Sequence, residues 1–91
     1  MSDGDARRQW VNENIEESAY LADGFDEAII GISARAGRLP IVAYDADKCI
    51  AILQRDGMDY EEAVECFDFN TLGAWVGEGT PEFITLYREQ Q

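Results

Sequence analysis

The sequence predicts an α+β domain in which a small three-stranded antiparallel sheet packs against a helical hairpin and an N-terminal helix. Three segments repeat apolar residues at intervals of three to five, which is typical of amphipathic helices. Three shorter segments are apolar, partly β-branched, and alternate like strands. With 91 residues the chain is long enough for one modest core. The predicted element order is α-β-β-α-α-β.

A first amphipathic helix is expected over residues 6–22. Trp10, Val11 and Ile15 are spaced for one apolar face, and acidic residues lie between them. Gly24 follows this pattern and should end the helix, because glycine readily adopts the left-handed conformation that closes helix ends.

A β-hairpin is expected next. Residues 28–35 are short, apolar and partly β-branched, and Ile30 and Ile32 alternate with small residues. A turn at residues 37–40 then leads into a second strand at residues 41–44.

A helical hairpin should follow the two strands. Asp45 or Asp47 can cap a helix over residues 48–55, and Gly57 is placed to close it in the left-handed conformation. Asp59 is the predicted N-cap of the second helix, because its carboxylate can accept from backbone amides of the first turn.

The second helix of the hairpin is harder to end by inspection. Its periodicity weakens after Phe67, so we expect the helix to end or kink within residues 70–73. Residues 83–87 then alternate well enough to form a third strand.

One domain is expected over residues 6–87. Residues 1–5 are small and polar, so we expect a disordered N-terminus, and residues 88–91 should fray. Cys49 and Cys66 lack the spacing of a redox or zinc pair and are interpreted as reduced core residues, with a disulfide between them as the alternative. No apolar run approaches the length of a membrane span, and the acidic N-terminus differs from a signal peptide. We therefore expect a cytoplasmic protein with no membrane partner.

The charge of the chain restricts its function. Nineteen acidic residues face seven basic ones, which gives a net charge of -12. Direct binding to nucleic acid requires clustered lysine and arginine, so we expect none, and a basic protein surface is the expected partner. The chain also has no histidine and one lysine, and it lacks a nucleophile elbow and a phosphate-binding glycine loop. We therefore predict no catalytic residues and no cofactor.

Acidic residues recur at helical spacing on two of the predicted helices. They could form solvated faces, a partner-binding surface, or, if the two helices faced each other, a magnesium site for phosphate chemistry. We favour the partner-binding and solvated readings and predict no metal site. The predicted partner-binding carboxylates on these helices are Glu61, Glu65, Asp68, Glu13, Glu16 and Glu17.

Residues 67–81 concentrate aromatic and small residues around Asn70. One interpretation is a structural corner in which Asn70 satisfies backbone groups. The other is a binding surface with Trp75 or Phe69 as an aromatic anchor and Glu78 at its rim. Both interpretations remain open from the sequence.

Several short motifs together resemble a group of small, uncharacterised bacteriophage and prophage proteins. The resemblance covers about residues 25–84 and implies a phage origin, in the cytoplasm of a bacterial host, without assigning catalytic residues. The motifs are Asp26-Glu27-Ala28-Ile29-Ile30-Gly31, Tyr44-Asp45 with Lys48-Cys49-Ile50, Asp56-Gly57-Met58, Glu61-Glu62-Ala63, Phe69-Asn70, Gly73-Ala74-Trp75-Val76-Gly77 and Thr80-Pro81.

Three hypotheses follow. The first is a non-enzymatic, acidic, phage-type interaction protein that binds and inhibits a host nucleic-acid-handling or defence complex, as anti-CRISPR proteins do, by occupying a basic surface. The second is a magnesium-dependent nucleotide or phosphate enzyme built on facing acidic helices. The third is a homodimeric structural module that pairs two copies through residues 67–75 or an edge strand.

Overall fold

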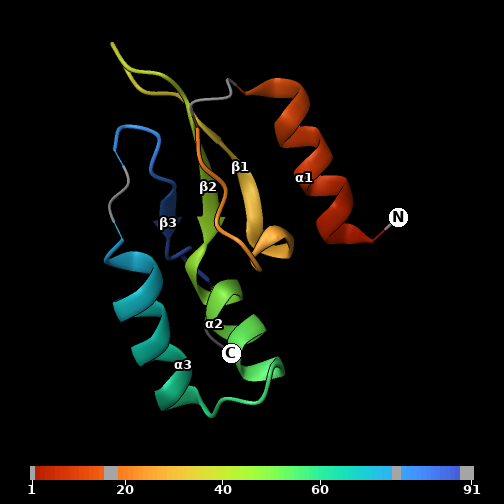
Figure 1. The fold of residues 1–91 in the computed structure, drawn as a ribbon, viewed down its shortest axis with the longest axis vertical. Coiled ribbons are helices and arrows are strands. Elements are labelled where there is room, and N and C mark those ends of the chain that lie inside the picture. Colours follow the sequence, from red (N-terminus) through yellow and green to blue (C-terminus); the bar gives the residue numbers. More distant parts are fainter. Residues whose placement is uncertain (1, 16–18, 75–76, 89–91) are drawn as a thin grey trace.

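The computed structural model describes residues 2–15, 19–74 and 77–88. They confirm the α+β class and the predicted element order (Figure 1). The elements are α1 (Asp3–Asn14), a 3-10 turn η1 (Asp26–Ala28), β1 (Ile29–Ser33), β2 (Ile41–Asp45), α2 (Ala46–Arg55), α3 (Tyr60–Phe67), a π-helical turn η2 (Asp68–Leu72) and β3 (Glu82–Ile84).

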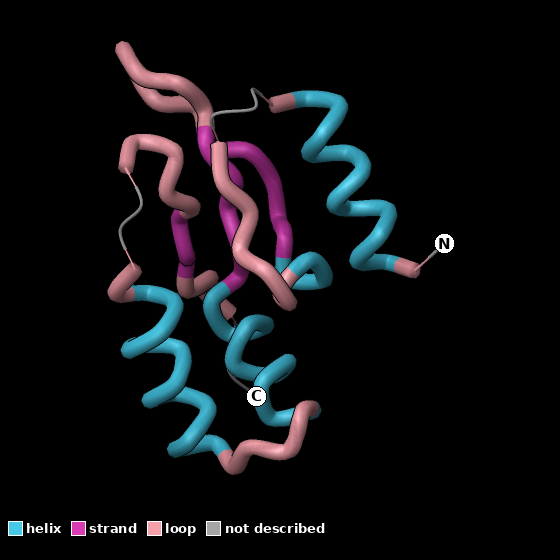
Figure 2. Tube along the Cα trace, in the orientation of Figure 1, coloured by secondary structure: helices cyan, strands magenta, loops and turns pink. Residues whose placement is uncertain are grey.

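The three-stranded sheet is mixed, so the prediction of a purely antiparallel sheet is wrong. Strand β2 is central, with β1 antiparallel on one side and β3 parallel on the other, where Tyr44 lies opposite Phe83. The reason is the connection from β2 to β3. Helix α2 leads away from the end of β2 and α3 returns, so the chain re-enters the sheet in the direction of β2 (Figure 2). Of the predicted third strand, residues 83–87, only Phe83 and Ile84 pair with β2, and the strand begins one residue earlier, at Glu82.

Helix α1 begins and ends earlier than predicted. The Ser2 hydroxyl accepts a hydrogen bond from the Asp5 backbone amide at 3.1 Å and caps the helix, so Asp3 to Asp5 are helical where disorder was expected. The helix ends at Asn14, and Ala22, which was predicted to be helical, contacts the sheet instead. The backbone amide of Ala22 donates to the Tyr44 hydroxyl at 2.8 Å, which holds Ala22 against the sheet.

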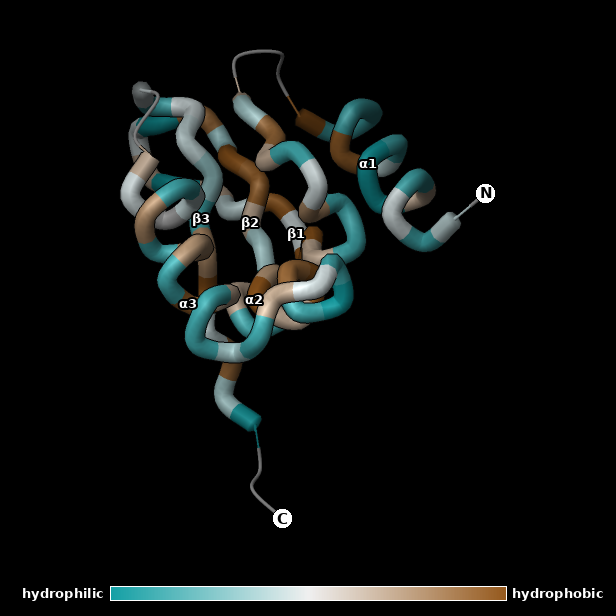
Figure 3. Tube along the Cα trace, turned by 60° about the horizontal axis from the view of Figure 1, so that its bottom comes forward, coloured by the Kyte–Doolittle hydropathy of each residue, from teal (hydrophilic) through white to brown (hydrophobic). Residues whose placement is uncertain are grey.

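The core lies on the Tyr44 face of the sheet. Tyr44 is fully buried and stacks on Phe83, with ring centroids 5.3 Å apart. Phe67 of α3 meets the Phe83 ring edge-on at 5.3 Å and the Phe25 ring edge-on at 6.5 Å. These aromatic contacts fix how α3 sits against the sheet. Hydrophobic positions gather on β1 and β2, whereas α1 and α3 mix them with hydrophilic ones (Figure 3).

The predicted caps of the hairpin helices are confirmed, although α2 begins at Ala46, two residues before the predicted start. Asp45, rather than Asp47, caps α2, because its Oδ1 accepts from the Lys48 backbone amide at 3.2 Å. Gly57 has a φ of 113°, as a left-handed residue after the helix requires. Asp59 caps α3 by accepting from the Glu62 backbone amide at 2.8 Å.

Neither cysteine is in a disulfide. Cys49 is buried in the core as expected, but Cys66 is only half-buried. In the described ranges no helix combines the length and the hydrophobicity needed to cross a bilayer.

Candidate functional site

The sequence predicted an acidic face on the helix that is now α3, and the fold exposes this face to solvent. Ala63 and Phe67 are buried, so their side of the helix faces the core. The side away from Ala63 and Phe67 faces solvent, as expected for an amphipathic helix on a sheet. The exposed carboxylates of this acidic face are Glu61, Glu62, Glu65 and Asp68.

The acidic face has no compensating positive charge nearby in the chain. Residues 56–87 contain eight acidic residues and no basic one. Among the described residues, the arginines that form ion pairs do so with Asp3, Asp26, Glu27, Asp45 and Asp47, all outside this face. The exposed carboxylates of the acidic face are therefore available to a partner.

The π-helical turn η2 adds an exposed aromatic ring to this surface. The chain continues from α3 into η2, where the Gly73 amide bonds to the Asp68 carbonyl at 3.1 Å. Phe69 is 88% exposed. It borders a shallow cavity of about 340 Å³ together with Met58, Glu62, Glu65 and Cys66. A π-helical turn inserts an extra residue and redirects the side chains after it, which is why such turns often occur at functional sites.

The predicted partner-binding residues do not form a single surface. Glu61 and Glu65 lie on α3 and Asp68 follows as the first residue of η2, whereas Glu13 lies on α1, at the opposite side of the molecule (Figure 1). Glu78 is exposed in the loop before β3. Glu16, Glu17 and Trp75 lie outside the described residues.

The arrangement opposes the magnesium hypothesis. Helices α1 and α3 lie on opposite sides in both views of the molecule, so the described part of α1 does not face the acids of α3 (Figures 1 and 3). Within residues 2–15, 19–74 and 77–88, no group of three or more histidine, cysteine or acidic side chains is close enough to hold a metal ion.

Neither the buried Tyr44 hydroxyl nor the buried Cys49 thiol is activated as a nucleophile. Burial raises the pKa of the Cys49 thiol to about 12, with the nearby Asp45 carboxylate acting in the same direction. Burial likewise raises the pKa of Tyr44 to about 12. Both groups therefore stay protonated at neutral pH and serve packing and hydrogen bonding.

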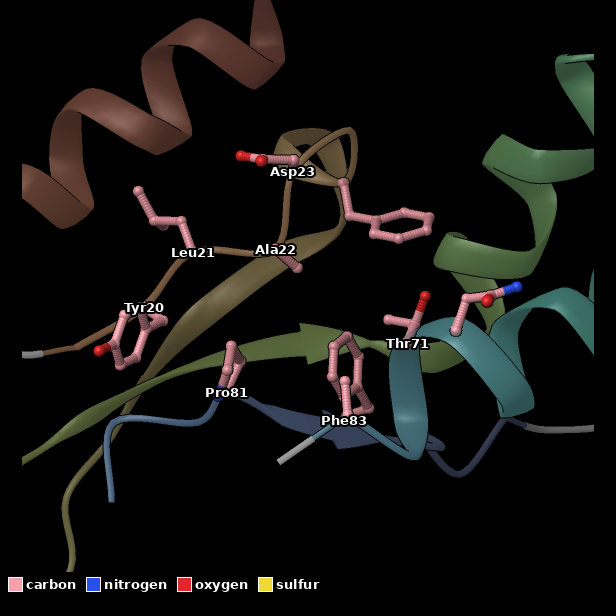
Figure 4. A pocket seen from close by; sticks show the side chains of 10 residues that line it. Tyr20, Leu21, Ala22, Asp23, Thr71, Pro81 and Phe83 are labelled. Carbon is pink, nitrogen blue, oxygen red and sulfur yellow. The ribbon is translucent and has the colours of Figure 1, made fainter. Parts of the chain in front are cut away.

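A cavity of about 330 Å³ lies between residues 20–25, η2 and the start of β3. Leu21 and Asp23 lie on one side of it and Pro81 and Phe83 on the other (Figure 4). Sequence reasoning missed this cavity because its walls come from three distant segments. The sequence offered one indication of it: residues 67–81 stood out for their aromatic and small residues around Asn70, and Asn70 lines the cavity.

Comparisons with protein-family models, with curated proteins and with solved structures gave no match to this chain.

Proposed function

We propose that this chain is a non-enzymatic interaction protein that uses the acidic face of α3 to occupy a basic surface of a host nucleic-acid-handling or defence complex, and thereby inhibits it. One observation carries the proposal. The acidic face holds four exposed carboxylates that, among the described residues, form no ion pair. The resemblance to phage proteins supplies the expectation of a bacterial host.

Physical chemistry favours a basic partner over other kinds of ligand. A net charge of -12 attracts basic surfaces over a Debye length of about 10 Å and speeds their association. Exposed carboxylates at helical spacing can meet several arginines or lysines at once, in place of the phosphates of nucleic acid. A surface held in this way is closed to its nucleic acid, so binding and inhibition are the same event.

Phe69 gives the acidic face a hydrophobic anchor. Its ring is 88% exposed and borders the same cavity as Glu62 and Glu65. An aromatic ring beside carboxylates suits an arginine of the partner, because the guanidinium can stack on the ring while it bonds to an acid.

The test is affinity capture from a bacterial lysate at low and at high salt, followed by binding measurements with each purified partner. Three proteins are compared: the natural chain, a variant with Glu61→Lys, Glu65→Lys and Asp68→Lys, and a control with Glu13→Lys, Asp23→Lys and Glu78→Lys. The control makes the same change in net charge at exposed positions outside α3.

We expect the α3 variant to lose at least about tenfold in affinity while the control loses much less, because close charge pairs outweigh distant ones. The captured partner should also release its nucleic acid when the natural chain is added. Equal loss in the two variants would reduce the interaction to nonspecific charge, and full binding by the α3 variant would refute the proposal.

A further inference from the structure

The two edges of the sheet differ in what lies beside them. The strand order is β1-β2-β3, so β1 and β3 are the edges. Helix α1 lies along β1, and its Arg7 donates a hydrogen bond to the Ile29 carbonyl (Figure 1). Among the described residues, no strand pairs with the outer side of β3. An unpaired edge of this kind can take up a strand from another chain.

The residues that follow β3 have the composition of a strand but no strand beside them. Residues 83–87 are all aromatic, aliphatic or β-branched and carry no charge. Strand β3 nevertheless ends at Ile84. Its neighbour β2 ends opposite, at Asp45, where the chain turns into α2. Residues 85–87 are therefore left without a partner strand in the part of the chain that the structure describes.

These residues also lie open to a second molecule. The exposed fraction is 37% for Leu86 and 84% for Tyr87, and neither forms a backbone hydrogen bond with a described residue. The chain after β3 leaves the body of the fold (Figure 3). Neighbouring apolar residues exposed in this way mark a site of interaction, and a strand-forming sequence favours pairing with another strand.

The order of the side chains identifies the partner. Residues 83–87 show the same chemical classes when read from either end: aromatic, aliphatic, threonine, aliphatic, aromatic. If two copies pair antiparallel about Thr85, Phe83 lies opposite Tyr87, Ile84 lies opposite Leu86, and Thr85 lies opposite itself. Aromatic pairs and threonine pairs are among the cross-strand contacts that stabilise an antiparallel ladder. A second copy of this chain therefore matches every position, and two-fold pairing closes the assembly at a dimer.

This register continues the packing of the core. Phe83 stacks on Tyr44, with ring centroids 5.3 Å apart. Residues directly opposite each other in a ladder lie on the same face of the sheet, so Tyr87 of the second copy would lie beside Phe83, on the side away from Tyr44. Glu82 and Arg88 flank the segment with opposite charges, so the paired segments add no net charge to the interface.

We propose that two copies of this chain form a homodimer in which residues 83–87 pair antiparallel about Thr85. Pairing extends β3 from Ile84 to Tyr87 in each copy and joins the two sheets into one. Five residues from each copy bury less than the roughly 1,200–2,000 Å² of a stable interface, so the dimer is weak, with a dissociation constant on the order of 10–100 μM. The dimer uses the edge of the sheet, and the acidic face of α3 is not part of it.

The experiment is sedimentation equilibrium of the full chain at about 5–500 μM, a range that brackets the expected dissociation constant. We expect the average mass to rise from that of one chain toward that of two. The dissociation constant should fall when sodium chloride is raised from about 50 to about 500 mM, because salt screens the repulsion between two chains of net charge -12. Binding of a basic partner by α3 should weaken over the same range of salt, so failure of this proposal and failure of the proposed function are distinguishable.

A charge swap at Thr85 tests the register, because in residues 83–87 only this residue meets its own copy. Thr85 is exposed, so its variants should fold. Thr85→Lys and Thr85→Glu should each lose at least about tenfold in dimer affinity, because like charges then lie directly opposite each other. An equimolar mixture of the two variants should recover the affinity, because opposite charges meet instead.

Gln54, which is exposed on α2, provides the matched control. Gln54→Lys and Gln54→Glu make the same changes in charge away from the proposed interface. Each should dimerise within about twofold of the natural chain, and mixing them should gain nothing. Tyr87→Ser removes the aromatic pair at both ends of the interface and should weaken the dimer at least about fivefold.

Three results would overturn the inference. The first is the mass of a single chain at every protein and salt concentration. The second is dimerisation of Thr85→Lys or Thr85→Glu equal to that of the natural chain. The third is failure of the mixed Thr85 variants to recover affinity, which would exclude pairing about this residue.

Discussion

Among the described residues, five carboxylates around α1, η1 and the start of α2 lie beside arginines, whereas the carboxylates of the acidic face do not. In the first region, the ion pairs beyond the local one within α1 join separate segments of the chain. Arg8 of α1 pairs with Asp26 of η1, and Arg55 of α2 pairs with Glu27 of η1. Arg88, after β3, pairs with Asp45 and Asp47. On the acidic face the carboxylates are exposed and form no ion pair with any residue that the structure describes. Acidic residues in this chain therefore serve either assembly of the fold or presentation of charge, according to where the few arginines lie.

This division has an energetic meaning. A paired carboxylate that also satisfies backbone groups contributes to the free energy of unfolding, and its removal should destabilise the protein. An unpaired carboxylate among like charges contributes repulsion, and its removal should do little or stabilise. Single substitutions can test which group each acid belongs to.

The largest loss of stability is expected at Asp45, because its carboxylate makes two separate interactions. Its Oδ1 caps α2 through the Lys48 amide, and its Oδ2 accepts from Arg88 at 2.6 Å. Only 9% of the side chain is exposed. Asp45→Ala removes both interactions, so we expect a loss of about 2 kcal/mol in the free energy of unfolding, measured by urea denaturation.

Asp47 provides the matched control for Asp45. It also lies near Arg88, at 3.6 Å, but its side chain is 51% exposed. Asp47→Ala should therefore change stability by less than about 0.5 kcal/mol. Similar losses for the two variants would mean that the cap and the burial of Asp45 add nothing to the ion pair.

The second largest loss of stability is expected at Asp59, the N-cap residue of α3. Its carboxylate accepts from the Glu62 amide at 2.8 Å. Asp59→Ala should lower the free energy of unfolding by about 1 kcal/mol, the usual value of an N-cap. Asp56→Ala is the control, because Asp56 is also exposed and acidic but follows α2. If the two variants denatured alike, the division between structural and presented acids would fail within α3.

Sequence reasoning succeeded where the physics is local. The caps at Asp45 and Asp59 act over three residues, and the left-handed Gly57 is set by its own backbone. The stripe of acids on α3 is equally local, because helical spacing alone places Glu61, Glu65 and Asp68 on one side. These features of the fold and of the candidate site could therefore be predicted.

Sequence reasoning failed where partners are distant in the chain. The periodicity of residues 6–22 favoured one helix, but Ala22 instead bonds to the Tyr44 hydroxyl, 22 residues away. Arg88 was expected to fray, yet it reaches Asp45, 43 residues away. The direction of β3 depended on the whole α2–α3 connection.

A smaller loss of stability is expected when Arg8 is replaced, because its ion pair joins α1 to η1. Its Nη1 lies 3.1 Å from Asp26 Oδ1, with 40% of the Arg8 side chain exposed. Arg8→Gln should cost about 0.5 kcal/mol, as expected for a half-exposed pair. Hydrogen exchange should show faster opening of α1 than of β2. Arg38→Gln, in the exposed hairpin turn, is the control, and equal protection of α1 in both variants would refute a role for the pair.

The smallest change in stability is expected at Glu65, where the substitution should stabilise the protein. Helical spacing places Glu61 four residues before it and Glu62 and Asp68 three residues away on either side, so it carries the most like-charge repulsion on α3. Glu65→Gln should raise the free energy of unfolding by roughly 0.3 kcal/mol at low salt, and the gain should shrink as sodium chloride screens the charges. Glu61→Gln is the control, because Glu61 lies in the first turn, where the helix dipole favours a negative charge and offsets the repulsion. A loss of stability in Glu65→Gln would place this carboxylate with the acids that hold the fold together, and would remove Glu65 from the surface available to a partner.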